Sequence, residues 1–239
     1  IQLIMIADEN FINVSQIDGI GANAQFQDLN SLDPSNAFLM ITHSSLMPTS
    51  INYAAYRSSP AGGMHNAILI DVEELYHQFG GGIEKHPVAI RSFLRMAFGE
   101  WSTEPEHLFL IGKSISNKAD GSNGSREKVS SFTANLVPTW GYPGSDNHIS
   151  QGVNGTGKSY AIPTGRISVN TNIDLLNYLD KVMQYEAQQE PNSSYTIANK
   201  EWQKNILHFN GCEDAVECSV IGGNLDLYKN TIEDTLFGG

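Results

Sequence analysis

The sequence has few cysteines, few charged residues and no cluster of basic side chains. Its 239 residues include two cysteines, 26 acidic residues and 14 Lys or Arg, and charged residues make up 17% of the chain, below the roughly 25% of typical globular domains. Two cysteines are too few for a disulfide framework. With no basic run and a formal net charge of −12, the chain lacks the electrostatic footprint of nucleic-acid binding.

Long apolar runs and metal-binding spacings are missing as well. Apolar runs such as residues 37–41 fall far short of the ~20 residues that cross a bilayer, so we predict no membrane insertion. The histidines are dispersed, without His-x-x-x-His or paired Cys-x-x-Cys spacing, so the sequence predicts no zinc site. What remains is an acidic globular chain whose 40% hydrophobic residues can form a core.

Apolar segments alternate with amphipathic helical patterns from residue 33 onward. The pattern predicts strands at 37–41, 67–70, 108–111, 159–162 and 205–209, and helices at about 48–57, 73–79, 87–97, 171–186 and 225–236. Polar residues 117–131 predict a surface loop. Solidly apolar strands between helices favour an α/β fold, a three-layer sandwich with a mostly parallel sheet. Residues 1–32 lack this alternation, and we assign them to the end of a preceding β-rich domain.

Residues 152–159, GVNGTGKS, match the P-loop pattern of nucleotide-binding proteins letter for letter. Such a loop holds phosphate only between a buried strand and the N-terminus of a helix. Here the preceding residues are polar, and the following ones are typical of a strand that Pro163 closes. We therefore predict a Gly/Asn turn and keep a nucleotide binder as the least favoured alternative.

Cys212 and Cys218 lie six residues apart, a spacing that permits a small disulfide loop, but we favour free thiols. His208 precedes Cys212 by four residues, and a neighbouring imidazole can activate a thiolate. However, His208 falls in a predicted apolar strand, and Gly211 lies between the two residues. A structural histidine and an incidental thiol are therefore the favoured interpretation.

Two acidic residues lie where α/β folds commonly place their sites, beyond the carboxyl ends of strands. Asp71 ends an apolar run, and Asp146 lies between Ser145 and Asn147 in a Gly-rich loop. Carboxylate and amide oxygens suit a hard cation such as calcium. An aspartate that only shapes a turn is the alternative. We take Asp146 as the candidate metal ligand and calcium as the candidate cofactor.

Several short motifs follow one another between residues 37 and 209. They are Asp71–Gly82 (DVEELYHQFGGG), His86–Leu94 (HPVAIRSFL), Leu108–Gly112 (LFLIG), Val137–Trp140 with Ser145-Asp146, Gly165–Val169 (GRISV) and Leu175–Glu186. This series resembles the gingipain family of cysteine peptidases, and in particular its large members associated with the type IX secretion system. The resemblance implies a caspase-like fold and a secreted, periplasmic or cell-surface location.

For the full-length protein, the resemblance implies a cysteine endopeptidase that acts on peptide or protein substrates. Signal-peptide processing in type IX secretion is one such role, and calcium binding occurs among family members. Two features depart from the family: the third strand ends in Gly112-Lys113 where Gly-Asp is frequent, and the sequence contexts of the catalytic His and Cys do not occur.

We therefore expect residues 33–239 to be the N-terminal subdomain of the peptidase domain, truncated before the catalytic dyad. On this interpretation the chain contains no catalytic residue, is inactive alone, and needs the missing C-terminal half of the domain as a partner. A non-catalytic binding or scaffold module of the same fold is the alternative.

Overall fold

The computed structural model describes residues 26–116, 128–155, 157–189, 196, 202, 205–234 and 236. The chain divides into two compact units, the first ending at Ala187 and the second beginning at Gln188. Most of the segment predicted to be β-rich lies outside the described residues. The part that is described, residues 26–32, is irregular, and its Leu29 is buried in the core of the first unit.

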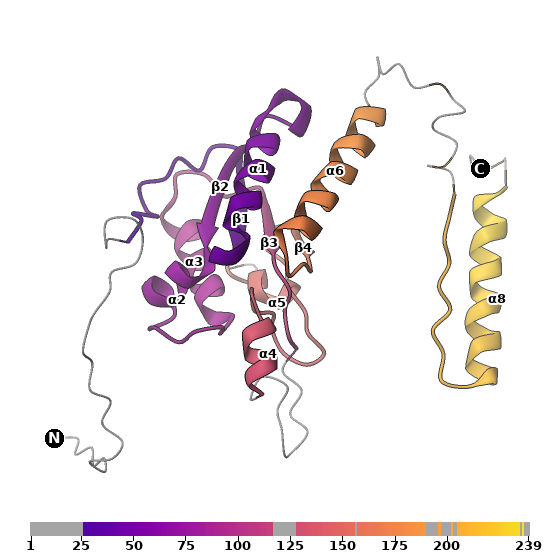
Figure 1. The fold of residues 1–239 in the computed structure, drawn as a ribbon. Coiled ribbons are helices and arrows are strands. Elements are labelled where there is room, and N and C mark those ends of the chain that lie inside the picture. Colours follow the sequence, from indigo (N-terminus) through magenta and orange to yellow (C-terminus); the bar gives the residue numbers. More distant parts are fainter. Residues whose placement is uncertain are drawn as a thin grey trace, which may run out of the picture. The chain divides into compact units, whose positions relative to one another are not determined.

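A four-stranded sheet lies at the centre of the first unit (Figure 1). Its strands are β1 (Ala37–Thr42), β2 (Asn66–Asp71), β3 (His107–Ile111) and β4 (Thr164–Ile167), in the order β2-β1-β3-β4. Every pairing is parallel, and Met40 of β1 is opposite both Leu69 and Phe109. The predicted parallel α/β sheet is confirmed.

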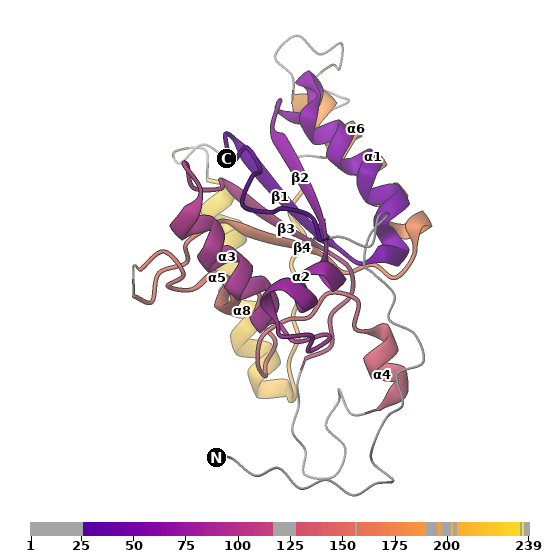
Figure 2. The same cartoon turned by 90° about the vertical axis from the view of Figure 1, so that its left-hand side faces the viewer.

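Helices cover both faces of this sheet. The described helices of this part of the chain are η2 (Ser44–Leu46), α1 (Met47–Ser58), η3 (Pro60–Gly62), α2 (Val72–Phe79), α3 (Val88–Glu100), α4 (Val129–Ala134), α5 (Asn147–Ser150) and α6 (Asn172–Gln189). Figure 2 shows α2 and α3 against one face, and α1 with α6 on the other. The three layers of the predicted sandwich are therefore present.

The central strands are apolar throughout because each face of the sheet has its own core. Leu39 and Ile41 of β1 belong to the cluster that α2 and α3 complete, whereas Met40 belongs to the cluster on the α1 and α6 side. Thr171 accepts a hydrogen bond from the Asp174 amide at 3.2 Å, so α6 begins at the predicted capping pair.

Two predicted strands are wrong, and one predicted loop is wrong in its described part, where a helix begins. Residues 159–162 are not a strand: Tyr160 forms only an isolated bridge, and β4 begins at Thr164, after Pro163. Pro163 fits there because its carbonyl accepts from Leu108 and no donor is needed. Residues 205–209 are irregular, with Phe209 86% exposed, since apolar side chains without a partner strand make no sheet. Of the predicted loop 117–131, residues 117–127 lie outside the described residues. Its last residues are not a loop, because α4 begins at Val129.

In the second unit, α8 (Ala215–Ile232) begins ten residues earlier than the predicted 225. The Asp214 carboxylate accepts hydrogen bonds from the amides of Val216 and Glu217, both at 2.8 Å, and so caps the helix. The capped first turn brings Cys218 to a Cα–Cα distance of 5.1 Å from Cys212, and the two form a disulfide. Our prediction of free thiols is wrong. Among the described residues, no helix is long and apolar enough to span a membrane.

Candidate functional site

The carboxyl ends of the four strands meet at one edge of the sheet, where α/β folds commonly place their sites. Thr42 of β1 lies opposite Asp71 of β2 and Ile111 of β3, and Ile111 lies opposite Ile167 of β4. We call this row of strand ends the carboxyl edge. Both acidic residues singled out from the sequence, Asp71 and Asp146, lie beside it.

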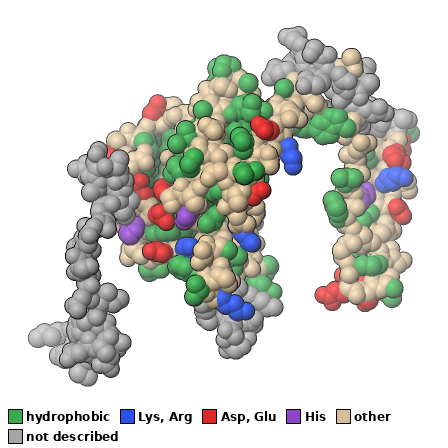
Figure 3. All heavy atoms as spheres, viewed as in Figure 1, with side chains coloured by type: hydrophobic (Ala, Val, Ile, Leu, Met, Phe, Trp, Pro, Cys, Tyr) green, Lys and Arg blue, Asp and Glu red, His purple; other side chains and the backbone are tan. Residues whose placement is uncertain are grey.

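Asp71 begins α2. Its carboxylate accepts a hydrogen bond from the Glu73 amide at 3.0 Å, which satisfies a free donor of the first turn. Burial raises the pKa of Asp71 above its ordinary value. His43 approaches from the end of β1, with Nε2 3.4 Å from Glu73 Oε1. Acidic and histidine side chains gather over the region of α2 (Figure 3). The geometry shows Asp71 as a helix cap.

Asp146 precedes α5 and forms a two-point ion pair with Arg166 of β4. Arg166 Nε donates to Oδ2 at 2.7 Å, and Nη2 donates to Oδ1 at 2.9 Å. The guanidinium also donates to the carbonyls of Gly112, Val137 and Pro138 at 2.8, 2.9 and 3.2 Å. One planar fork of donors therefore joins β4, the end of β3 and the loops around them. The calcium role of Asp146 stays a prediction.

The P-loop-like segment is a closed turn. Gly152 donates from its amide to the Ser159 carbonyl at 2.9 Å, and Gln151 bridges to Tyr160. A Cβ at Gly152 would lie 2.2 Å from the Gly157 carbonyl oxygen, so only glycine fits this turn. Among the described residues after Lys158, the next helix begins only at Asn172. The predicted turn is confirmed, and no helix N-terminus stands behind it to hold phosphate.

The cysteines offer no nucleophile in this structure. Both are in the disulfide, so neither thiol is free. His208, which we expected inside a strand, is exposed in an irregular segment. A thiolate activated by an imidazole therefore does not form around Cys212.

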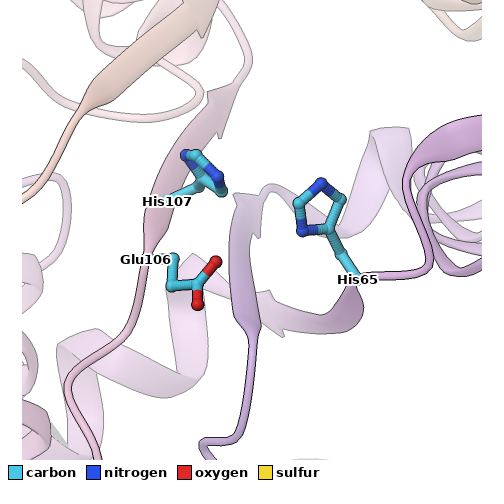
Figure 4. A group of neighbouring side chains, drawn as sticks. All are labelled: His65, Glu106 and His107. Atoms are coloured by element: carbon cyan, nitrogen blue, oxygen red, sulfur yellow. The ribbon is translucent and has the colours of Figure 1, made fainter.

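In the described part of the chain, one group of side chains has the composition of a metal site: His65, Glu106 and His107 (Figure 4). It lies at the opposite edge, where the strands begin. The group has neither helical nor Cys-x-x-Cys spacing in the sequence, because its residues precede or begin two different strands. Their positions directly before two apolar runs were the available signal.

The model of peptidase family C25 matches residues 31–236. The crystal structure of dimeric latent PorU from Porphyromonas gingivalis is similar, with a TM-score of 0.53 and 16% identity, and the match covers 78% of this chain and 20% of that one. A structure described as a protease matches at a TM-score of 0.46 and 15% identity, over 78% of this chain and 34% of that one.

No curated protein sequence matches the chain. The chain spans a fifth of the PorU structure that it matches, 20% of that chain, and the likeness to PorU concerns the fold. The family model, in contrast, extends over most of the chain and includes every helix and strand described above. The chain therefore belongs to peptidase family C25, the gingipain family of cysteine peptidases.

Proposed function

We propose that the chain is the N-terminal α/β subdomain of a cysteine endopeptidase that cleaves protein substrates. The observation that carries this proposal is the family match over residues 31–236, on a parallel sheet with a well-ordered carboxyl edge. In this role the subdomain supplies a rigid framework. Arg166 fixes the end of β3 and the neighbouring loops, beside the place where α/β folds receive ligands.

The nucleophile of such an enzyme would come from residues other than these 239. Acyl transfer through a thioester needs a free thiolate and a nearby base, and both cysteines of the chain are in a disulfide. The chain by itself is therefore expected to hydrolyse no peptide.

The same disulfide favours a second candidate, a non-catalytic binding or scaffold module of this fold. A protein that had lost the catalytic chemistry would keep the sheet, the cap at Asp71 and the Arg166 network, because these residues serve the fold. The two candidates differ only in whether the full-length protein carries a reactive thiol.

We further propose that the protein is secreted or lies at the cell surface, with processing of signal peptides in type IX secretion as its specific role. The Cys212–Cys218 disulfide supports an oxidising compartment. The likeness in fold to PorU is the second observation that supports this proposal.

Calcium at Asp146 is a separate proposal. An ionised carboxylate has about four lone-pair sites, so Asp146 could bind an ion while it remains paired with Arg166. If it does, calcium should raise the melting temperature of the chain, and Asp146→Asn should remove that rise. An equal rise in melting temperature for the parent chain and for Asp146→Asn would contradict the proposal.

An active-site probe distinguishes the two candidate functions. The full-length protein and the 239-residue chain would each be treated with a peptidyl chloromethyl ketone, and the labelled cysteine located by mass spectrometry. The peptidase predicts labelling of one cysteine outside these residues and hydrolysis by the full-length protein alone. A full-length protein that is neither labelled nor active would establish the non-catalytic module.

The chain alone provides the control. Cys212→Ala and Cys218→Ala both break the disulfide, but each leaves a different thiol free. Hydrolysis by the unmodified chain that disappears only in Cys212→Ala would show that the nucleophile lies within these residues, and would overturn the proposal.

A further inference from the structure

We propose that His65, Glu106 and His107 form a zinc-binding site at the amino edge of the sheet. One ligand atom from each residue lies within 4.8 Å of the other two. Figure 4 shows the two imidazoles and the carboxylate gathered at the start of the strands. Two imidazole nitrogens and one carboxylate oxygen form a donor set that zinc binds with a water in the fourth position.

The parallel pairing of the strands creates this cluster. His65 directly precedes β2, and His107 begins β3. Both strands pair with β1, where Ala37 is opposite Asn66 and Phe38 is opposite His107. Residues that enter β2 and β3 are therefore fixed on either side of β1, at the same edge, by the backbone hydrogen bonds of the sheet.

Neighbouring side chains hold the two imidazoles in place. The Phe38 ring lies 5.3 Å from each of the His65 and His107 rings, measured between centroids, and the two imidazoles are themselves 5.3 Å apart. Asn36 Oδ1 is 3.2 Å from His65 Nδ1, while the Asn36 amide donates to the Met64 carbonyl at 2.9 Å. Ligands oriented by such outer contacts lose little freedom when a metal binds.

Only small movements separate the cluster from a bound geometry. Zinc–nitrogen bonds of about 2.0–2.1 Å in a tetrahedron place donor atoms about 3.3 Å apart. The Glu106 side chain is exposed, so rotation about its own bonds can bring the carboxylate closer to the half-buried imidazoles. A zinc ion would then connect the entries of β2 and β3, which β1 separates.

The electrostatic surroundings permit a cation at this place. The guanidinium of Arg57 lies over the Phe38 ring, with its Cζ 5.6 Å from the ring centroid. Its charge is compensated, because Arg57 Nη1 lies 2.9 Å from Glu186 Oε1. The Glu106 carboxylate supplies a negative charge within the cluster itself.

The test is a zinc titration of the full 239-residue chain, purified without a histidine tag, by calorimetry and by thermal melting. We expect one zinc per chain at micromolar affinity or tighter, and a rise in melting temperature because zinc binds the folded site. Glu106→Gln and His107→Gln should each weaken binding at least about tenfold. Glu104→Gln and His77→Gln, at exposed positions outside the cluster, should leave it unchanged.

Cobalt provides a second readout. Co²⁺ bound in a four-coordinate site absorbs strongly in the visible region, and Glu106→Gln should remove this absorption. Glu106 is exposed, so this variant should fold even if His107→Gln does not. No binding at high micromolar zinc, or equal affinity in the parent chain and Glu106→Gln, would overturn the proposal.

Discussion

At the scale of single residues, Arg166 joins several segments of the carboxyl edge. It pairs with both Asp146 oxygens and donates to three backbone carbonyls, and it is 11% exposed. Arg166→Lys keeps the charge but not the planar fork of donors. We expect the free energy of unfolding, measured with urea, to fall by about 1–3 kcal/mol, because a half-buried carboxylate loses one partner and the carbonyls lose others.

Arg95 of α3 provides the matched control for that substitution, because it is exposed. Arg95→Lys should change the free energy of unfolding by no more than about 0.5 kcal/mol. If the two variants were equally stable, the hydrogen bonds of Arg166 would contribute nothing measurable, and its role at the edge would have to be abandoned.

At the scale of elements, two substitutions of Asp71, the N-cap of α2, distinguish the effect of its hydrogen bond from the effect of its charge. Asp71→Ala removes the acceptor for the Glu73 amide and should cost about 1 kcal/mol of unfolding free energy. Asp71→Asn keeps an acceptor and removes a charge that burial disfavours. It should therefore be at least as stable as the parent at neutral pH.

The pH dependence follows from the direction of the Asp71 shift. Burial raises the folded-state pKa of Asp71 above the ordinary 3.8. The folded state therefore binds this proton more tightly than the unfolded state does. The resulting contribution to the free energy of unfolding is complete below the unfolded-state pKa and is lost as pH rises through the folded-state pKa. The stability of Asp71→Asn relative to the parent should therefore increase from acid to neutral pH in urea melts. A difference that stays constant, or changes in the opposite direction, would show that desolvation is not the dominant cause.

Elements with strong local signals were predictable, and elements that depend on a partner were not. Residues 37–41, 67–70 and 108–111 became β1, β2 and β3 because runs buried on both faces are apolar throughout. Residues 205–209 were also predicted as a strand, but they pair with no strand among the described residues, which composition cannot reveal. The early start of α8 has a local signal in the sequence, Asp214 with Glu217 three residues on.

At the scale of the whole molecule, the candidate sites depend on contacts between distant segments. The sequence places Asp146 in a loop, but it does not show that its partner is Arg166 of β4. His65 and His107 come together only because β2 and β3 both pair with β1. Strand order is a property of the folded sheet. Residue spacing along the chain therefore could not predict either cluster.

The division of the chain into two units leads to a prediction about the disulfide. All described side chains of α8 are exposed or half-exposed, so α8 has little packing within its own unit, and tertiary packing is the main source of helix stability in proteins. The Cys212–Cys218 bond closes a short loop across the first turn of α8, and the chain-entropy model gives such a loop about 2 kcal/mol of stabilisation.

In the variant with Cys212→Ser and Cys218→Ser, we therefore expect the amides of α8 to exchange with solvent at least tenfold faster, the equivalent of about 1.4 kcal/mol. Hydrogen-exchange mass spectrometry measures this rate. The amides of β1 and β3, whose hydrogen bonds lie within the first unit, serve as the internal reference and should keep their protection. Unchanged exchange in α8 would show that the Asp214 cap alone maintains the helix, and loss of protection in β1 and β3 would show that the two units do not unfold separately.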